Sequence, residues 1–292
     1  MLYGSIEAGG TKFVCAVGDE TLEILHRESF PTTNPEQTMK DVVAFFKPYE
    51  EQMAGIGIGS FGPIDIHEDS PTYGFITSTP KVAWQNFDFV GMMKREFSVP
   101  IAWTTDVNAA AYGEYRFGHG QDVDSVVYYT IGTGVGGGAI QKGRFVEGFS
   151  HPEMGHMLVV PHVDDSYKGN CPFHGNCLEG MAAGPAIEKR LGKKGADVPE
   201  TDPFWLIEAE YIAQCVYNTT LMLSPDVIIL GGGVMKQTHM LEKVRKAFTK
   251  LMQGYVQTPP LATYIVTPAL EDNAGTMGCL ALAQKVACST EK

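Results

Sequence analysis

The chain has 292 residues, of which 44% are hydrophobic and 19% are charged. These values are typical of a soluble globular protein with one large or two medium domains. The formal net charge of −12 argues against a nucleic-acid partner, which requires clustered Lys and Arg. No apolar run approaches the length of a membrane span, and the N-terminus carries Glu7 and Lys12 without an apolar signal region. We therefore expect a cytoplasmic protein with no membrane partner.

The N-terminal segment is predicted to form a glycine-tipped hairpin. Leu2 to Ala8 and Phe13 to Val17 are apolar strands, and Gly9-Gly10-Thr11 lies between them. Glycines allow backbone N–H groups to turn toward an anion, and Thr11 adds a hydroxyl donor. The order of a Walker A loop is absent. Taken alone, such a tip is more often only a tight turn.

Alternating helices and strands follow. We predict helices over Thr33 to Phe46 and Phe87 to Phe97, and strands over Gly55 to Pro63 and Ile101 to Thr104. The first of these strands ends in a second glycine turn. The segment Thr72 to Trp84, rich in Pro, Thr and aromatic residues, fits either a loop over a pocket or an ordinary surface loop.

Asp106 stands at the end of a predicted strand and opens a helix of small residues, Val107 to Gly113. A carboxylate at this place lies where ligands meet an α/β sheet. Asp is also a good helix N-cap, so position alone leaves both interpretations open.

The second half repeats this order. Ser125 to Ile131 is predicted as a strand that enters a second glycine tip, Gly132 to Gly138, which contains Thr133. Further helices are predicted at Ala183 to Leu191, Pro203 to Leu223 and Met240 to Met252, and further strands at Asp226 to Leu230 and Ala262 to Val266. The strand from Asp226 ends in Gly231-Gly232-Gly233, and a last helix of small residues spans Asn273 to Ala283.

A cluster of soft ligands lies between these elements. Cys171, His174 and Cys177 recur at intervals of three, and His156 can supply a fourth ligand. Two Cys and two His in a closed tetrahedral set suit structural zinc. Glu153 and Glu179 bracket the cluster, and a bound ion would fix these two carboxylates so that they can hold a polar ligand.

Other interpretations of this cluster remain open. Cys171 and Cys177 could form a disulfide or be inert buried thiols, although the intervening His has no role in a disulfide. His151 and His162 are rivals for the place of the fourth ligand. A reducing compartment favours metal binding by the six cysteines over disulfides.

The repeated order predicts a duplicated α/β fold with a cleft between the halves. We expect an N-terminal domain over residues 1–115, with the helix at 274–292 packing back on it. The second domain is expected over residues 116–273, with a zinc-binding insertion at 151–180. Small residues in the two Ala- and Gly-rich helices would let these helices cross closely. Glycine tips facing each other across the cleft would form a phosphate clamp.

Together these motifs resemble the ROK sugar kinases of the actin-like ATPase (ribonuclease H-like) superfamily over essentially the whole chain, and the bacterial fructokinase branch fits best. The segments that carry the resemblance are Gly4 to Thr11, Asp106 to Ala111, Ile131 to Gly138, Glu153 to His156, Cys171 to Glu179 and Leu230 to Gly233. The resemblance implies phosphorylation of a hexose by ATP with Mg²⁺, most readily D-fructose to fructose 6-phosphate, in a homodimer with structural Zn²⁺.

The resemblance also implies roles for single residues. Asp106 falls at the position of the catalytic base. Sugar contacts fall at Thr105, Asp106, Glu153, His156 and Glu179. The zinc ligands fall at His156, Cys171, His174 and Cys177. The nucleotide-binding residues fall at Gly9, Gly10, Thr11, Lys12, Thr133, Gly134, Gly231, Gly232 and Gly233.

Two positions depart from the family pattern. Many relatives have Asp where this chain has Glu7, and Asn where it has Thr105. The second change disfavours a glucokinase-type pocket and favours fructose, while the role of Glu7 near the Mg-phosphate is left open.

Three rival functions remain. A related kinase could act on glucose, mannose or an N-acetylhexosamine. A sugar-sensing regulator of this family carries an N-terminal DNA-binding module, for which a hairpin beginning at residue 4 leaves no room. A dinucleotide oxidoreductase is disfavoured because no G-x-G-x-x-G opens a helix after the first strand.

Overall fold

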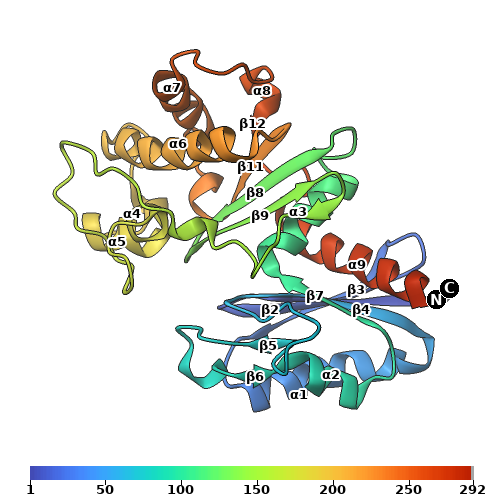
Figure 1. Ribbon diagram of the computed structural model, residues 1–292. Helices are drawn as coiled ribbons and strands as arrows, with labels where there is room; N and C mark the ends of the chain where they lie inside the picture. The colour runs from blue at the N-terminus through green and yellow to red at the C-terminus, as the bar shows by residue number, and fades with distance from the viewer. Residues whose placement is uncertain (291–292) are drawn as a thin grey trace. The chain divides into compact units, whose positions relative to one another are not determined.

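The computed structural model describes residues 1–290 (Figure 1). The chain forms two compact units. Unit 1 contains Met1–Gln121, Phe145–His151 and the chain from Asp272 onward, and unit 2 contains Asp122–Arg144 and Pro152–Glu271. Unit 1 is therefore built from three separate pieces of the sequence.

Unit 1 is built on a five-stranded sheet in the order β3-β2-β1-β4-β7. Strands β1, β4 and β7 are parallel, whereas β2 is antiparallel to both β1 and β3. The strands are β1 (Leu2–Ala8), β2 (Lys12–Gly18), β3 (Ile24–Pro31), β4 (Met53–Ser60) and β7 (Ile101–Thr105). A separate short ribbon pairs β5 (Phe75–Ile76) with β6 (Phe87–Asp88).

Helices cover both faces of this sheet (Figure 1). On one face lie α1 (Pro35–Phe46) and α2 (Phe89–Glu96), and on the other lie α3 (Asp106–Phe117) and α9 (Ala274–Thr290). Helix α1 begins where Asn34 accepts a hydrogen bond from the Gln37 amide and Pro35 occupies the first turn, two features that favour a helix start. A cluster of buried aromatic side chains fills the core beneath α1 and α2, comprising Phe13, Phe46, Trp84, Phe89 and Phe97.

Unit 2 contains a second five-stranded sheet, in the order β10-β9-β8-β11-β12. Strand β9 is antiparallel to β8, whereas β11 is parallel to both β8 and β12. The strands are β8 (Ser125–Ile131), β9 (Val135–Gln141), β10 (Arg144–Phe145), β11 (Val227–Gly231) and β12 (Ile265–Val266).

The helices of unit 2 are α4 (Leu178–Ala182), α5 (Gly184–Leu191), α6 (Phe204–Leu223), α7 (Met240–Met252) and α8 (Leu261–Tyr264). Short 3-10 turns occur in both parts of the chain, at Lys47–Gln52, Val82–Trp84, Met154–His156, Gly195–Asp197, Val234–Lys236 and Glu271–Asn273. Within the described part of the chain, no helix is long and apolar enough to cross a membrane.

The two sheets share one strand order, which confirms the predicted duplicated α/β fold. In each sheet an antiparallel hairpin is followed by two further strands parallel to its first strand. The two hairpins are β1–β2 and β8–β9. The glycine turns at their tips are therefore equivalent positions in the two sheets.

Several predicted boundaries were wrong. The predicted helix from Phe87 begins only at Phe89, because Phe87 and Asp88 pair with β5. The predicted strand from Ala262 starts as α8 and leaves only Ile265–Val266 extended. The second tip is shorter than predicted, since the strand resumes at Val135. Strand β3 and helix α4 were not predicted.

The prediction that two helices of small residues cross closely is confirmed. A Cβ added to Gly113 of α3 would overlap the carbonyl oxygen of Ala274, and one added to Gly278 of α9 would overlap the carbonyl oxygen of Ala109. Backbone therefore packs directly on backbone where α3 meets α9.

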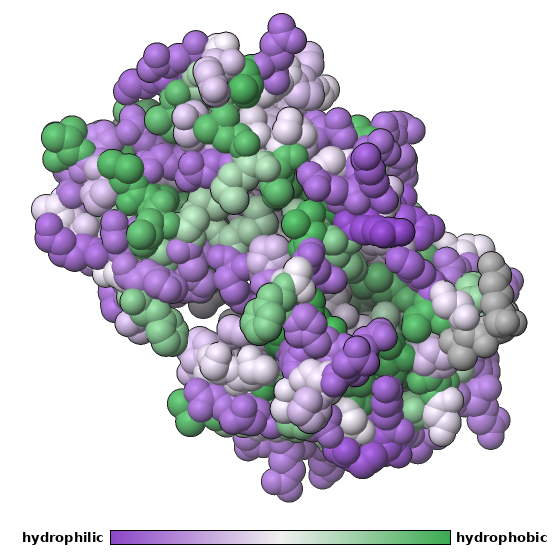
Figure 2. Space-filling view, viewed as in Figure 1, coloured by the Kyte–Doolittle hydropathy of each residue, from purple (hydrophilic) through white to green (hydrophobic). Residues whose placement is uncertain are grey.

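Apolar side chains also reach the molecular surface, as green patches among polar residues in Figure 2.

We expect Gly278→Ala to lower the free energy of unfolding by about 1–3 kcal/mol, because the added methyl overpacks this crossing. Thermal or urea unfolding measures the change. Gly148→Ala is the matched control, since a Cβ at Gly148 meets nothing within 4 Å. Equal stability of the two variants would show that the helices can separate without cost.

Candidate functional site

In unit 1, the candidate residues lie at one end of the sheet. Glu7 of β1 is level with Gly59 of β4, which is level with Thr104 of β7. These three strands are parallel, so their carboxyl ends share one edge, where ligands of α/β sheets bind. Asp106 follows β7 directly as the first residue of α3.

Asp106 is held by the start of α3. Its Oδ1 accepts a hydrogen bond of 2.9 Å from the Val107 backbone amide. Thr105, not Asp106, is the N-cap, because its Oγ1 accepts from the Asn108 amide at 3.1 Å. The Asp106 carboxylate is therefore not needed to cap the helix, so its presence calls for another explanation.

Burial raises the pKa of Asp106 to about 6 from its usual 3.8, although the Val107 amide opposes the shift. A Cβ on Gly59 would meet the Cα of Asp106 at 3.3 Å and the Cβ of Ala109 at 2.7 Å. Glycine on β4 thus lets α3 lie directly on the sheet. A carboxylate that titrates near neutral pH is well matched to accept a proton from a substrate.

Glu7 is a second carboxylate at this edge. Its Oε2 accepts a hydrogen bond of 3.2 Å from Thr276 Oγ1 at the start of α9. Burial raises its pKa, and the negative charge of Asp106 raises it further. The two acids therefore influence each other, and together they would attract a cation.

The first glycine tip joins β1 to β2. The Gly9 amide donates to the Lys12 carbonyl at 3.0 Å, and Thr32 Oγ1 donates to the Gly9 carbonyl at 2.7 Å. Thr11 and Lys12 are exposed at the tip, as an anion site requires.

Sequence reasoning missed Lys81 as a neighbour of this tip. A Cβ on Gly10 would lie 3.2 Å from Lys81 Cε, so a second ammonium group stands beside the glycines. Lys81 belongs to the segment predicted as a pocket wall or surface loop, and a cation within that segment was the available signal. Trp84 at the end of the same segment is buried in the core and donates from Nε1 to the Thr33 carbonyl at 2.7 Å.

In unit 2 the two remaining glycine turns meet. A Cβ on Gly132 would lie 3.7 Å from the Gly233 amide nitrogen, and Gly232 has φ +88°. Thr133 and Gly233 are exposed, while Gly231 is buried at the end of β11. Sequence positions about 100 residues apart thus form one surface of exposed backbone and a hydroxyl.

The four predicted metal ligands come together. One donor atom from each of His156, Cys171, His174 and Cys177 lies within 4.8 Å of the others. Burial raises the pKa of the Cys177 thiol to about 11, so the thiol stays protonated at neutral pH unless a cation stabilises the thiolate. Two thiols and two imidazoles at this spacing fit a tetrahedral zinc ion.

The contacts bear on the open alternatives for this cluster. Cys171 and Cys177 are both free thiols. His151 belongs to unit 1, where its Nε2 accepts from the Ile64 amide at 3.1 Å. His162 Nε2 lies 3.5 Å from Glu210. Neither rival histidine joins the group of four, and His156 is the histidine that lies beside Cys171, His174 and Cys177.

Glu179 follows the ligand cluster directly along the chain. Cys177 caps α4 by accepting a hydrogen bond from the Gly180 amide, and Glu179 lies in the first turn. Glu179 Oε2 accepts from the Val135 amide at 3.0 Å, next to the second glycine tip. Glu153 precedes the ligand cluster in the chain. It comes directly before the 3-10 turn that carries His156, and it is exposed.

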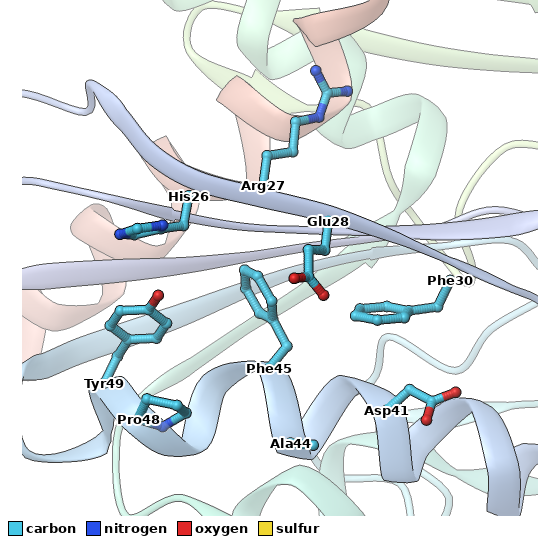
Figure 3. A pocket seen from close by; sticks show the side chains of 9 residues that line it. All are labelled: His26, Arg27, Glu28, Phe30, Asp41, Ala44, Phe45, Pro48 and Tyr49. Carbon is cyan, nitrogen blue, oxygen red and sulfur yellow. The ribbon is translucent and has the colours of Figure 1, made fainter.

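A hollow of about 380 Å³ lies elsewhere in unit 1, between β3 and α1 (Figure 3). Alternate residues of β3 (His26, Glu28 and Phe30) point toward α1, and Arg27 points to the opposite face of the strand. None of the predicted site residues lines this hollow. The candidate site and this hollow are therefore separate features.

A family model described as "ROK family" matches residues 3–286. The chain belongs to the ROK family. This ROK protein is 53% identical over 290 residues to a fructokinase of Streptococcus mutans serotype c, which covers 98% of each chain. It is 50% identical to a fructokinase of Pediococcus pentosaceus, with 97% of this chain and 98% of the relative covered.

The fold of this ROK protein is also similar to a solved structure. A ROK family glucokinase from Streptomyces griseus in complex with glucose and AMPPNP matches with a TM-score of 0.78 and 25% identity, over 98% of this chain and all of the other. The family and the actin-like ATPase fold that the sequence motifs predicted are thereby confirmed.

For this ROK protein we expect Asp106→Asn to raise thermal stability at pH 8 but not at pH 4. The folded-state pKa of about 6 lies above the usual 3.8, so the folded state favours the protonated carboxyl. The free energy of unfolding therefore falls as pH rises through this window, and an uncharged Asn escapes that loss. Melting curves from pH 4 to 8 measure it. A variant no more stable than wild type at pH 8 would show that Asp106 is not desolvated.

Proposed function

We propose that this ROK protein is an ATP-dependent hexose kinase that phosphorylates D-fructose on its 6-hydroxyl. The observation that carries the proposal is the 53% identity to a fructokinase over 98% of both chains. Asp106, at the carboxyl edge of the sheet of unit 1 and with a pKa raised to about 6, supports the same conclusion because this chemistry requires a base at the acceptor hydroxyl.

Asp106 serves as the general base in this proposal. The sugar 6-hydroxyl attacks the γ-phosphorus of ATP, its oxygen forms the new P–O bond as the bond to ADP breaks, and Asp106 accepts the hydroxyl proton. The Val107 amide keeps the carboxylate oriented. Thr105 lies beside the base, and its hydroxyl already caps α3. It is therefore less free to reach a sugar than the longer Asn side chain that many relatives have at this position.

The glycine tips of each unit supply groups that can bind phosphate oxygens. In unit 1, the amides of Gly9 and Gly10, the hydroxyl of Thr11 and the charges of Lys12 and Lys81 are available to phosphate oxygens. In unit 2, Thr133, Gly134, Gly232 and Gly233 offer exposed or partly exposed backbone and a hydroxyl to phosphate oxygens, and the buried Gly231 leads β11 into this turn. Glu7 is the carboxylate in this part of unit 1 that suits Mg²⁺, which prefers oxygen ligands and neutralises phosphate charge when bound.

The four-ligand cluster holds a structural zinc ion. The donor set of two Cys and two His leaves no open position for a reactant, so the ion would stabilise the segment that carries Glu153, His156 and Glu179. These three side chains hold the sugar hydroxyls. The Glu179 carboxylate retains acceptor capacity for this role, because its hydrogen bond from the Val135 amide uses one oxygen.

Asp106→Asn should lower kcat by about 10²- to 10⁴-fold, because removal of a general base has this effect, while fructose affinity stays close to wild type. Coupled ADP release and calorimetric titration with fructose measure the two quantities. Asp41→Asn, a partly buried carboxylate on α1 outside the site, is the control. Near-normal turnover of the Asp106 variant would remove the assigned base.

A related kinase of glucose, mannose or an N-acetylhexosamine is the second candidate, favoured by the fold shared with a glucokinase. A panel of these sugars with ATP separates the possibilities by kcat/KM. We expect the highest value for fructose. A higher value for glucose or N-acetylmannosamine would change the substrate and leave the kinase assignment intact.

Cys177→Ser should lose stoichiometric zinc and unfold at a lower temperature, because three remaining ligands bind the ion more weakly and structural zinc contributes to folding. Metal analysis of the purified protein with a melting curve checks both. Cys215→Ser replaces another buried free cysteine of unit 2 and should retain zinc. Full zinc occupancy of the Cys177 variant would contradict the ligand set.

The homodimer and the cytoplasmic location implied by the family complete the proposal. Sedimentation analysis of the purified protein tests the first of these.

A further inference from the structure

A largely buried arginine lies in unit 2, outside the four-ligand cluster. Arg190 lies on α5, and only 10% of its side chain is exposed. It packs over the rings of Tyr167, Phe204 and Tyr211, with its guanidinium carbon 4.6, 5.2 and 5.8 Å from the three ring centroids. A charged group enclosed this far is costly unless its contacts compensate for lost hydration.

The guanidinium joins two segments that carry functional residues. Its Nη2 donates to the Met181 carbonyl of α4 at 3.0 Å and lies 3.2 Å from Asp165 Oδ2. Helix α4 begins next to Cys177 and contains Glu179. Asp165 belongs to residues 157–170, which we call the metal loop because they connect His156 to Cys171.

Asp165 fixes the metal loop to α6 as well. Its Oδ2 accepts from Tyr211 Oη at 2.8 Å, and the same Tyr211 oxygen accepts from the His162 amide at 3.0 Å. Gln214, on the same helix, both donates to and accepts from the Val160 backbone. The loop is therefore held by protein contacts along its length as well as by the ligands at its ends.

The charges in this cluster balance. Glu208 of α6 is fully buried, 3.8 Å from Arg190 Nη1, and burial raises the pKa of its carboxyl well above the usual value. A neutral Glu208 leaves one negative charge, on Asp165, opposite one positive charge, on Arg190. Both Glu208 oxygens, Tyr167 Oη and two Arg190 nitrogens have no hydrogen-bond partner within the protein, so we expect ordered water among them.

We propose that Arg190 is a positioning residue for the sugar-binding carboxylate Glu179 and for the metal ligands, acting through its Nη2, which contacts both α4 and the metal loop. This inference rests on the proposed function for the identity of the sugar and the ion. Groups that hydrogen-bond metal ligands typically change metal affinity or activity by about 10- to 100-fold when removed, and Arg190 acts one contact further out, so we expect the lower end of this range.

Lysine at this position keeps the charge but loses the planar guanidinium that stacks over the three rings and fixes Nη2 between Met181 and Asp165, so we expect it to hold the two segments less firmly. For Arg190→Lys we expect the KM for fructose to rise about tenfold while the KM for ATP changes less than twofold. Zinc transfer to a coloured chelator should become about tenfold faster. Hydrogen exchange of the metal loop should increase in zinc-free protein.

Arg245→Lys is the matched control. Arg245 lies on α7 of the same unit, is also largely buried, and also joins elements through backbone carbonyls, those of Ala262 and Ile265. It touches neither α4 nor the metal loop in the contacts described. We expect this variant to lose stability while its KM for fructose and its rate of zinc transfer stay within twofold of wild type.

Asp165→Asn provides a second variant if Arg190→Lys folds poorly. It keeps an oxygen acceptor for Tyr211 but removes the charge opposite Arg190, so it should shift the same three measurements in the same direction. Glu208→Gln imitates the neutral carboxyl and should leave all three close to wild type.

Two outcomes would overturn the inference. One is wild-type fructose KM, zinc transfer and loop exchange in both Arg190→Lys and Asp165→Asn. The other is equal changes in Arg245→Lys, which would mean that these measurements follow overall stability.

A failure of the proposed function gives a different result. A wild-type protein that does not phosphorylate fructose removes the KM measurement, and one without zinc removes the transfer measurement. Exchange of the metal loop in metal-free Arg190→Lys and Arg245→Lys still decides whether Arg190 holds that loop.

Discussion

Direct packing of α3 on the sheet of unit 1 is the constraint on which the rest of the proposed chemistry depends. Gly59 on β4 and Gly113 and Gly278 at the crossing with α9 leave no room for a Cβ. The first residue of α3 is thereby placed at the carboxyl edge of the sheet with its carboxylate desolvated, which raises the pKa of Asp106 to about 6. The raised pKa of Asp106 thus depends on the small residues. If α3 packed less closely, the Asp106 carboxylate would be hydrated and its pKa would be lower.

In unit 2 the main constraint is different, because a long segment with little regular structure has to be held in place. Between His156 and Cys171 the chain contains neither a helix nor a strand. Such a segment has few backbone partners of its own, so its order must come from ligands and side chains. The thiols and imidazoles gather its two ends, while Tyr211, Gln214 and Arg190 hold its middle to α5 and α6. Helix α4, which carries Glu179, begins where these two sets of contacts meet.

The sequence predicted much of this arrangement for identifiable reasons. Strands such as Ser125–Ile131 and helices such as Met240–Met252 were predicted with the observed bounds, because their apolar patterns are long and regular. Strand β3 was missed because nearly all its residues are exposed at a sheet edge, so it lacks an alternating pattern. Helix α4 was missed because five residues show no helical period. The strand predicted from Ala262 failed because its first residues form α8, and an apolar run this short does not distinguish the two structures.

By itself the sequence determined the duplicated α/β order, the family, and the residue types of the candidate site, since glycine turns, ligand spacing and the acid at the start of α3 are local features written in consecutive residues. Only the tertiary structure decided which second histidine lies with Cys171, His174 and Cys177. It also decided that Lys81 lies beside the first glycine tip and that Arg190 links α4 to the metal loop. These are contacts between residues up to about 70 positions apart. Spacing along a chain does not reveal such neighbours, because they are set by how helices and sheets pack.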